Sequence, residues 1–345
     1  MTRVWVGAAE ASGDRLAASL IGELQRRRPG LRVAGMAGPA LRAAGVTAHA
    51  RAEDATALGL AEVATSLPRF ARLLRDLSAS IRTFDPAVVV TVDSPDLLLR
   101  VAGRATAPSV HWVSPQLWAW RPGRVQWIAR QVDSMMCLLP FEPALYQGTR
   151  VRAVFTGHPA AGVQPAADPP RPGTPTFALL PGSRPGEVRR LWPALRQVAQ
   201  ELRDRHPGCG FVVPVAATID PAQLGGLDVT YVPTVAECAG ADAAVVASGT
   251  ATVELAALGV PMVVIYRVHP LTWQLGKRLV RGVSHVALPN IIAGRSVVPE
   301  VLQELDPVRI ADALQTAAPV PPDVLSALAP LGAVCRAADE VEAWL

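Results

Sequence analysis

Short apolar runs that alternate with longer helical patterns constrain the fold of this chain most strongly. The clearest run, residues 86–92, reads Pro-Ala-Val-Val-Val-Thr-Val and is typical of a parallel strand buried on both faces. Similar runs predict strands at residues 3–7, 31–36, 110–113, 134–138 and 151–155, and again at residues 176–180, 210–214, 229–232, 243–247 and 261–266. Helical patterns fall between them, so the predicted fold class is α/β, with parallel sheets covered by helices.

The length of 345 residues favours two domains, and composition suggests where they meet. Residues 159–175 are rich in proline, which is typical of a semi-rigid connection. The expected division is therefore a first domain over residues 1–165 and a second over residues 170–320. Residues 321–345 form a C-terminal helical segment that is a candidate to return to the first domain.

Charge and cysteine content exclude several classes of protein. The formal net charge is only +4, and basic residues do not cluster with aromatic ones, so nucleic acid is not an expected partner. The four cysteines are far apart and form no Cys-x-x-Cys pair, which argues against a zinc site and fits a reducing cytosol. No signal peptide is expected at the start of the chain, and Glu254 and Pro261 interrupt its most apolar stretch.

The turn after residues 176–180 is a candidate anion site. It contains Gly182, Ser183 and Arg184 and leads into a long helical pattern. Free amides at a helix start attract phosphate, and an arginine adds a planar fork of donors. An ordinary strand-to-helix turn with a solvated arginine remains an alternative.

A small-residue loop after residues 3–7 is a second candidate. It carries Glu10, Ser12, Gly13 and Asp14 at the carboxyl end of a strand, where sheets of this type bind ligands. The loop lacks Gly-x-Gly-x-x-Gly, so a dinucleotide cofactor is not supported. Ser12 and Asp14 could instead be helix caps.

Two further loops follow strands of the first half. Residues 86–92 deliver Asp93 and Asp96 to a strand end, where a carboxylate could act as a general base. Their Asp-x-x-Asp spacing and the absence of Asp-x-Asp weaken a metal site, and both could be structural. The next strand leads to Trp118, Trp120 and Arg121, which either bind a ligand or anchor the loop.

In the second half, one loop and the single asparagine of the chain are further candidates for site residues. Ser248, Gly249 and Thr250 end a predicted strand, and Glu254 follows one turn into an apolar helix. That carboxylate could accept hydrogen bonds from a ribose diol or be satisfied by backbone. Asn290 is the only asparagine of the chain, which suggests a specific role or a chance survivor in a turn.

Residues 57–77 have an amphipathic pattern. Leucines and Phe70 share one helical face, while Arg69, Arg72 and Arg75 lie along the other. A basic amphipathic helix can lie on a membrane surface. The same spacing is also the usual signature of a helix that packs on its own core, and the pattern alone favours that interpretation.

Together these segments resemble the lipid-A-disaccharide synthases, which are inverting, metal-independent glycosyltransferases of GT-B fold. The matching segments are residues 10–14, 93–96, 113–115, 118–121, 139–142, 157–159, 179–184, 247–254, 288–290 and 293–295. They occur in the family's order, although Ala9 replaces a usual glycine and residues 161–162 replace a common aspartate. The resemblance implies two Rossmann-like domains that face a cleft.

The resemblance also implies a reaction. UDP-2,3-diacylglucosamine would donate its sugar to 2,3-diacylglucosamine 1-phosphate, without a cofactor or a metal, to give UDP and a β-1,6-linked disaccharide 1-phosphate. Asp93, Arg184 and Asn290 fall on positions critical for activity, with Asp93 as the catalytic aspartate. The substrate-binding candidates are Glu10, Ser12, Gly13, Asp14, Trp120, Arg121, Gly182, Ser183, Ser248, Gly249, Thr250 and Glu254.

The resemblance also implies a cellular location, and two alternative functions remain. By resemblance the first domain takes the acceptor and faces the membrane, which now makes residues 57–77 a membrane-contact candidate. The expected location is cytoplasmic, peripheral at the anionic inner face of the cytoplasmic membrane, and a homodimer is the candidate assembly. A UDP-sugar 2-epimerase of the same fold and a non-catalytic nucleotide-sugar-binding protein are the alternatives.

Overall fold

The computed structural model describes residues 2–56, 63–120, 122–216, 219–270, 273–274, 284–328 and 332–345. Within those ranges, the side chains of residues 55–56, 63–67, 120 and 122 lie outside the description. The chain divides into two compact units, the first formed by Met1–Pro159 with Gly332–Leu345 and the second by Ala160–Leu331. The last 14 residues thus rejoin the first unit, and the helix α13 (Pro322–Leu328) belongs to the second.

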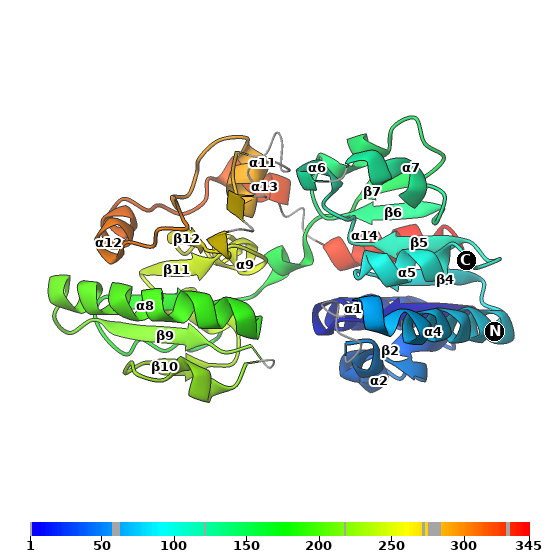
Figure 1. Ribbon diagram of the computed structural model, residues 1–345, viewed down its shortest axis with the longest axis horizontal. Helices are drawn as coiled ribbons and strands as arrows, with labels where there is room; N and C mark the ends of the chain where they lie inside the picture. Colours follow the sequence, from blue (N-terminus) through cyan, green and yellow to red (C-terminus); the bar gives the residue numbers. More distant parts are fainter. Residues whose placement is uncertain are drawn as a thin grey trace. The chain divides into compact units, whose positions relative to one another are not determined.

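The first unit is built on a seven-stranded parallel sheet in the order β3-β2-β1-β4-β5-β6-β7 (Figure 1). Its strands are β1 (Arg3–Ala8), β2 (Arg32–Ala37), β3 (Thr47–Arg51), β4 (Val88–Val92), β5 (Ser109–Trp112), β6 (Ser134–Cys137) and β7 (Arg152–Phe155). All five residues of β4 are buried, as the apolar run predicts for a central strand. The order reverses direction between β1 and β4, which is the topological switch point of a Rossmann-type sheet.

Helices cover both faces of this sheet. They are α1 (Ala11–Arg27), α2 (Pro39–Ala43), α3 (Ala52–Thr56), α4 (Val63–Phe84), α5 (Pro95–Ala102), α6 (Leu117–Trp120), α7 (Val125–Ile128) and α14 (Ala333–Glu342), with the 3₁₀ turns η1 (Pro122–Arg124) and η2 (Glu142–Tyr146). One core cluster joins Leu20 of α1, Trp112 of β5 and Val341 of α14. A second cluster, with Trp5 and Leu98, lies beneath α4 and α5.

The second unit repeats the architecture with six parallel strands in the order β10-β9-β8-β11-β12-β13. They are β8 (Thr176–Leu180), β9 (Gly210–Pro214), β10 (Thr230–Val232), β11 (Ala243–Ala247), β12 (Met262–Tyr266) and β13 (Glu300–Leu302). The helical segments are η3 (Pro159–Gly162), α8 (Pro185–Arg205), η4 (Pro221–Leu224), η5 (Val235–Gly240), α9 (Ala251–Ala257), α11 (Leu288–Ala293), α12 (Pro307–Gln315) and α13. The predicted α/β fold of two Rossmann-like units is confirmed.

Helix α4 packs its apolar face against the first unit's own core. Leu74 and Leu77 are buried there, and Phe70 and Leu73 are partly buried against the same cluster. The arginines Arg69, Arg72 and Arg75 are exposed on the other face. The assignment of the leucine face to membrane contact is therefore wrong for Leu74 and Leu77, and the core interpretation of the pattern holds for them. Leu67 and residues 57–62 lie outside the described side chains.

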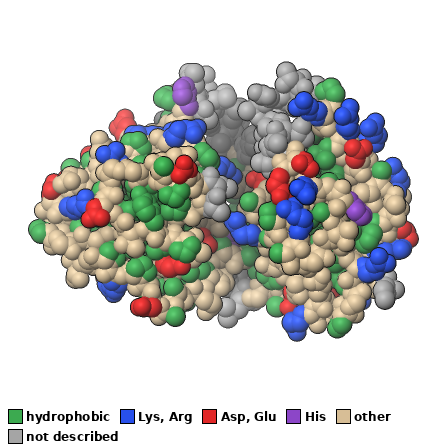
Figure 2. All heavy atoms as spheres, turned by 90° about the horizontal axis from the view of Figure 1, so that it is seen from below, with side chains coloured by type: hydrophobic (Ala, Val, Ile, Leu, Met, Phe, Trp, Pro, Cys, Tyr) green, Lys and Arg blue, Asp and Glu red, His purple; other side chains and the backbone are tan. Residues whose placement is uncertain are grey.

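No helix in the described part of the chain is both long enough and apolar enough to cross a membrane. On the face drawn in Figure 2, described basic and acidic side chains are distributed over both units and lie among one another.

Candidate functional site

The first unit gathers its candidate residues at the carboxyl edge of the sheet. Because β1 and β4 are neighbours at the switch point, the loops that follow them lie side by side. Gly13, in the first turn of α1, is so close to the end of β4 that an added Cβ would lie 3.1 Å from the Val92 carbonyl oxygen and 3.2 Å from the Asp93 Cβ. Glycine therefore permits the close approach that places the two predicted loops together.

Backbone strain is concentrated at the same edge. Asp93 has φ 57° and Ser94 has φ 47°, and Val113, after the neighbouring strand, has φ 83°. Aspartate tolerates this left-handed region, but a β-branched valine is an outlier there. Such strain persists where the surrounding structure enforces it, and it clusters at functional sites.

Few protein groups engage the Asp93 side chain. Its Oδ1 accepts a hydrogen bond from the Ser94 amide at 2.8 Å, and its own amide donates to the Trp112 carbonyl at 2.9 Å. The Ser94 hydroxyl is buried, and no described group bonds to it. Asp96 is engaged differently, because its exposed carboxylate pairs with Arg124 at 3.0 Å.

The other residues of the first loop differ among themselves. Asp14 is 2% exposed, and its carboxylate accepts bonds from the amides of Gly38 at 2.8 Å and Ala40 at 2.7 Å. It therefore caps the start of α2 rather than α1. Ser12 is exposed, and Glu10 precedes α1 without capping it.

A buried carboxyl in the matching segment at residues 139–142, which the motifs did not identify as a site residue, supports the tryptophan loop. Glu142 is 2% exposed, and it accepts bonds from the amides of Leu138 and Leu139, both at 3.0 Å, and from Trp118 Nε1 at 3.3 Å. Burial raises the pKa of Glu142 to about 7. Arg121 and the Trp120 side chain lie outside the described residues. Trp118 is therefore the one candidate side chain of this loop that the structure describes.

In the second unit, the predicted anion turn lies between β8 and α8. Gly182 has φ 100°, a conformation that favours glycine, and Arg184 is the exposed N-cap residue of the 21-residue α8. Glu187, in the first turn of the helix, lies against Gly182. Burial raises the pKa of Glu187, while the amides of Ser183 and Arg184 that donate to it act in the opposite direction. A carboxylate therefore lies against the turn that would suit a phosphate.

The next loop of this unit begins with Ser248, whose hydroxyl donates to the Val286 carbonyl at 2.7 Å. Gly249 has φ 153°, and its carbonyl accepts a bond from the Thr252 hydroxyl at 2.7 Å. Thr250 is exposed and precedes α9, which contains the partly exposed Glu254.

Asn290 is fully buried, and four protein groups use its side-chain amide. Its Nδ2 donates to the Val298 carbonyl at 2.9 Å and to Glu300 Oε1 at 2.7 Å. Its Oδ1 accepts from the amides of Val297 at 2.7 Å and Val298 at 2.9 Å. An asparagine amide has two donor hydrogens and two acceptor lone pairs, so its capacity is filled by the fold.

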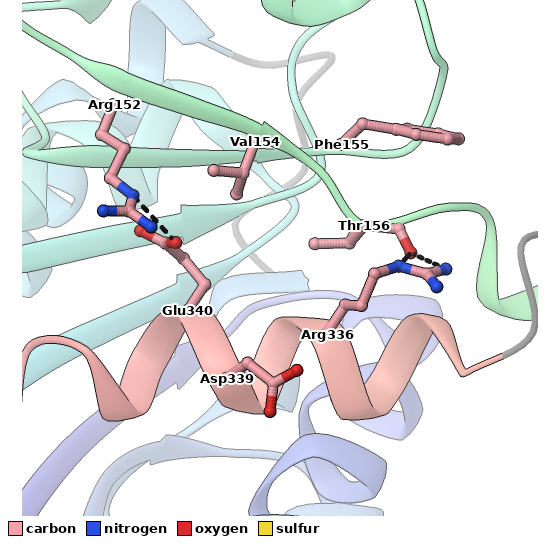
Figure 3. A pocket seen from close by; sticks show the side chains of 7 residues that line it. All are labelled: Arg152, Val154, Phe155, Thr156, Arg336, Asp339 and Glu340. Atoms are coloured by element: carbon pink, nitrogen blue, oxygen red, sulfur yellow. Dashed lines mark hydrogen bonds and ion pairs between the residues drawn. The ribbon is translucent and has the colours of Figure 1, made fainter.

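A cavity of about 200 Å³ lies elsewhere in the first unit, where α14 meets β7 (Figure 3). Arg152 forms an ion pair with Glu340 at 3.1 Å, and the Arg336 guanidinium donates hydrogen bonds to the Thr156 carbonyl. None of the candidate residues lines this cavity, and its charged groups are held by protein partners: besides these bonds, Asp339 pairs with Arg27 of α1. It is the seam along which the terminal helix is anchored.

Solved structures share the fold of this chain. The calicheamicin glycosyltransferase CalG4 has a TM-score of 0.67 at 21% identity, with 100% of this chain and 98% of that chain covered. A UDP-GlcNAc 2-epimerase from Neisseria meningitidis has a TM-score of 0.61 at 12% identity, with coverage of 99% and 100%. At these identities the likeness shows the fold alone, which is the two-domain α/β architecture of GT-B glycosyltransferases.

Sequence comparison is more specific. A family model described as Lipid-A-disaccharide synthetase matches residues 4–316. The Lipid-A-disaccharide synthase of Anaeromyxobacter dehalogenans (strain 2CP-C) is 44% identical over 336 residues, which are 90% of this chain and 86% of that relative. That of Myxococcus xanthus (strain DK1622) is 42% identical over 331 residues, with the same coverage. The chain therefore belongs to the lipid-A-disaccharide synthase family, and the resemblance read from its motifs is confirmed.

Proposed function

We propose that this protein joins two acylated glucosamines into the β-1,6-linked disaccharide 1-phosphate of lipid A. UDP-2,3-diacylglucosamine is the donor, 2,3-diacylglucosamine 1-phosphate is the acceptor, and UDP is released. Family membership supports the reaction. The observation in this chain that supports it best is Asp93, a lightly engaged carboxylate at the switch point of the first sheet.

In this proposal Asp93 is the general base. The acceptor 6-hydroxyl oxygen forms a bond to the anomeric carbon of the donor, and its proton passes to the Asp93 carboxylate. The bond from that carbon to the UDP oxygen breaks on the opposite side, which inverts the configuration at the carbon. Gly13 contributes by allowing the first turn of α1 to pack beside Asp93.

The leaving diphosphate gains negative charge as that bond breaks. Arg184 and the amides that begin α8 are the groups proposed to stabilise it, since a planar guanidinium can donate two parallel hydrogen bonds to phosphate oxygens. The loop at Ser248, Gly249 and Thr250, with Glu254, is proposed to hold the rest of the nucleotide. Diphosphate binding at Gly182 and Ser183 would have to displace the Glu187 carboxylate from its amides.

One incubation tests the function. Purified protein is supplied with UDP-2,3-diacylglucosamine, with and without 2,3-diacylglucosamine 1-phosphate, and the products are analysed by mass spectrometry and chromatography. A disaccharide 1-phosphate that requires both substrates is the expected result. An isomer of the donor that forms without the acceptor would identify an epimerase, and an unchanged donor would identify a binding protein.

Peripheral attachment to the anionic inner face of the membrane is part of the proposal, because both substrates are acylated. The exposed arginines of α4, rather than its buried leucines, are the groups proposed to meet lipid headgroups. Homodimer formation also remains a proposal, and sedimentation equilibrium would measure it.

A further inference from the structure

A second buried carboxylate holds together the part of the second unit that contains Asn290. Glu300 begins the edge strand β13, and its side chain is only 9% exposed. Its Oε1 accepts bonds from the Ala287 amide at 2.9 Å, the Val286 amide at 3.1 Å and Asn290 Nδ2 at 2.7 Å. Its Oε2 also lies 3.1 Å from the Val286 amide, so one side chain binds three donors, two just before α11 and one within it.

Asn290 completes the connection from the other side. While its Nδ2 reaches Glu300, its Oδ1 accepts the amides of Val297 and Val298. The side chains of Asn290 and Glu300 therefore link residues 286–290 to residues 297–300 by hydrogen bonds. Because these bonds are buried, the loss of one partner leaves the other unsatisfied at a cost that water does not offset.

Residues 286–290 in turn hold the loop at residues 248–250, which follows β11. The Val286 residue donates its amide to Glu300 and accepts the Ser248 hydroxyl on its carbonyl. The Ser248 amide is bound to the Ile265 carbonyl at 3.0 Å. A displacement of Val286 would therefore be transmitted to Ser248, the first residue of the loop at residues 248–250.

We propose that Glu300 is a positioning residue of the nucleotide site, and that Asn290 acts with it rather than by touching the substrate. The pair holds Val286 so that the loop at residues 248–250 has the geometry that UDP requires. This inference rests on the proposed function only in taking residues 248–250 as a nucleotide-binding loop.

The chemistry of the three donors explains why this position holds a glutamate. Ionised carboxylate oxygens only accept hydrogen bonds, and all three partners are donors. Glutamine would turn an NH₂ group toward one of them, and aspartate would fall short by one methylene. Glu304, four residues further on, is exposed and provides a matched control.

The test compares Glu300→Gln with Glu304→Gln. We expect Glu300→Gln to weaken UDP binding by roughly 10-fold in calorimetry, the effect of one mispaired buried group, and to speed amide hydrogen exchange at residues 248–250. Glu304→Gln should change neither. A folded Glu300→Gln protein with unchanged UDP affinity and unchanged exchange would overturn the proposal, whatever its melting temperature.

Two further variants separate positioning from simple loss of stability. Asn290→Ala and Glu300→Gln disturb the same buried hydrogen bond, so their effects on UDP affinity should combine to less than their sum. Ser248→Ala and Glu300→Gln act on the same residue, Val286, through its carbonyl and its amide respectively, so their effects on UDP affinity should also combine to less than their sum. Full additivity in both pairs would exclude the pathway through Val286.

The result of the Glu300 experiments can be distinguished from the result of the disaccharide assay that tests the proposed function. A wild-type protein that binds UDP but forms no disaccharide would refute the transferase and leave the UDP measurements to decide the role of Glu300. If Glu300→Gln does not fold, Ser248→Ala tests the same pathway from its other end. This variant should speed amide hydrogen exchange at residues 285–287 only if Ser248 and Val286 are coupled.

Discussion

Asp93 combines a carboxylate with a backbone conformation that few residues accept. At φ 57°, asparagine and aspartate are tolerated among side chains of this size, since a short polar side chain can bond locally in the left-handed region. The local bond here is the one from the Ser94 amide to Oδ1, which an asparagine oxygen can also accept. Replacing Asp93 by asparagine therefore changes the ability to take a proton while it preserves conformation and hydrogen bonding.

Asp93→Asn should lower turnover by roughly 10²- to 10⁴-fold, the usual contribution of a general base. UDP affinity and melting temperature should change little, because the proposed nucleotide contacts belong to the second unit and the backbone remains accommodated. Steady-state kinetics, calorimetry and thermal unfolding measure the three quantities. Turnover close to that of the wild type would mean that another group takes the proton.

Asp96→Asn is the matched control for that variant. The Asp96 side chain is 64% exposed and pairs with Arg124, an arrangement that contributes at most about 1 kcal/mol. We expect turnover to stay within a few fold of the wild type.

Glu142 predicts a specific dependence of stability on pH. Its pKa is raised from 4.5 to about 7 in the fold, so the folded state binds a proton that the unfolded state releases. The stability from this group is fully present below pH 4.5 and is lost as the pH rises through 7. Relative to Glu142→Gln, the wild type should lose about 2–3 kcal/mol of unfolding free energy between pH 5 and pH 8. Urea unfolding of both proteins measures this, and parallel pH profiles would contradict it.

The sequence placed the site only in part, for a physical reason. Asp93 follows β4 directly and Arg184 ends the short turn after β8, so the strand ends bring both residues to the ligand edge of their sheets. Glu187 and Glu300 resemble ordinary surface glutamates in the sequence, and the matching segment that contains Glu142 gives no sign that this carboxyl is buried. Their burial depends on backbone amides contributed by other segments, and that information is not local.

At the scale of elements, apolar runs predicted the central strands well. Strands β8, β9 and β11 have the expected limits, and β4 begins two residues later than its run because its first residues only lead into the sheet. Strands β3 and β13 were not predicted. Both are edge strands; β3 is mostly exposed and β13 has only three residues, so neither carries an apolar run.

Helix α4 yields a prediction from its buried face. Leu74 is 5% exposed, so Leu73→Glu with Leu74→Glu should place a charge in the core and unfold the first unit. Circular dichroism should show a loss of cooperative melting. A stable double variant with reduced vesicle binding would instead restore the leucine face as a membrane contact.

The exposed face of α4 yields a second prediction. Arg69→Gln, Arg72→Gln and Arg75→Gln together should leave the melting temperature unchanged. Binding to vesicles that contain phosphatidylglycerol should fall by roughly 100-fold, since each arginine near an anionic surface contributes about 1 kcal/mol. Co-sedimentation at two salt concentrations measures this, and unchanged binding would place the attachment elsewhere.

At the scale of the whole molecule, the last helix ties the end of the chain to its beginning. Ala337, Ala338 and Val341 of α14 are buried in the core cluster that also contains Val88, Val90 and Val92 of β4. Its carboxylates are held as well: Glu340 bonds to Ser134 at 2.8 Å and to Arg152, and Arg27 of α1 pairs with Asp339 and Glu342. The strand that delivers Asp93 thus shares a core with residues contributed some 250 positions later in the sequence, after the second unit has been completed.

Val341→Asp should therefore damage the first unit although only four residues follow it in the sequence. A charge buried beside β4 without a partner should lower the unfolding free energy by more than about 3 kcal/mol and reduce turnover through loss of order at Asp93. Val308→Asp is the matched control, because Val308 is 46% exposed and the change should stay within about 0.5 kcal/mol. Tryptophan fluorescence follows unfolding of both units, because Trp5 and Trp112 are fully buried in the first and Trp192 is buried in the second, and UDP affinity reports separately on the second. Equal stability of the two variants would mean that α14 does not hold the sheet, and the dependence of the proposed base on the chain terminus would have to be given up.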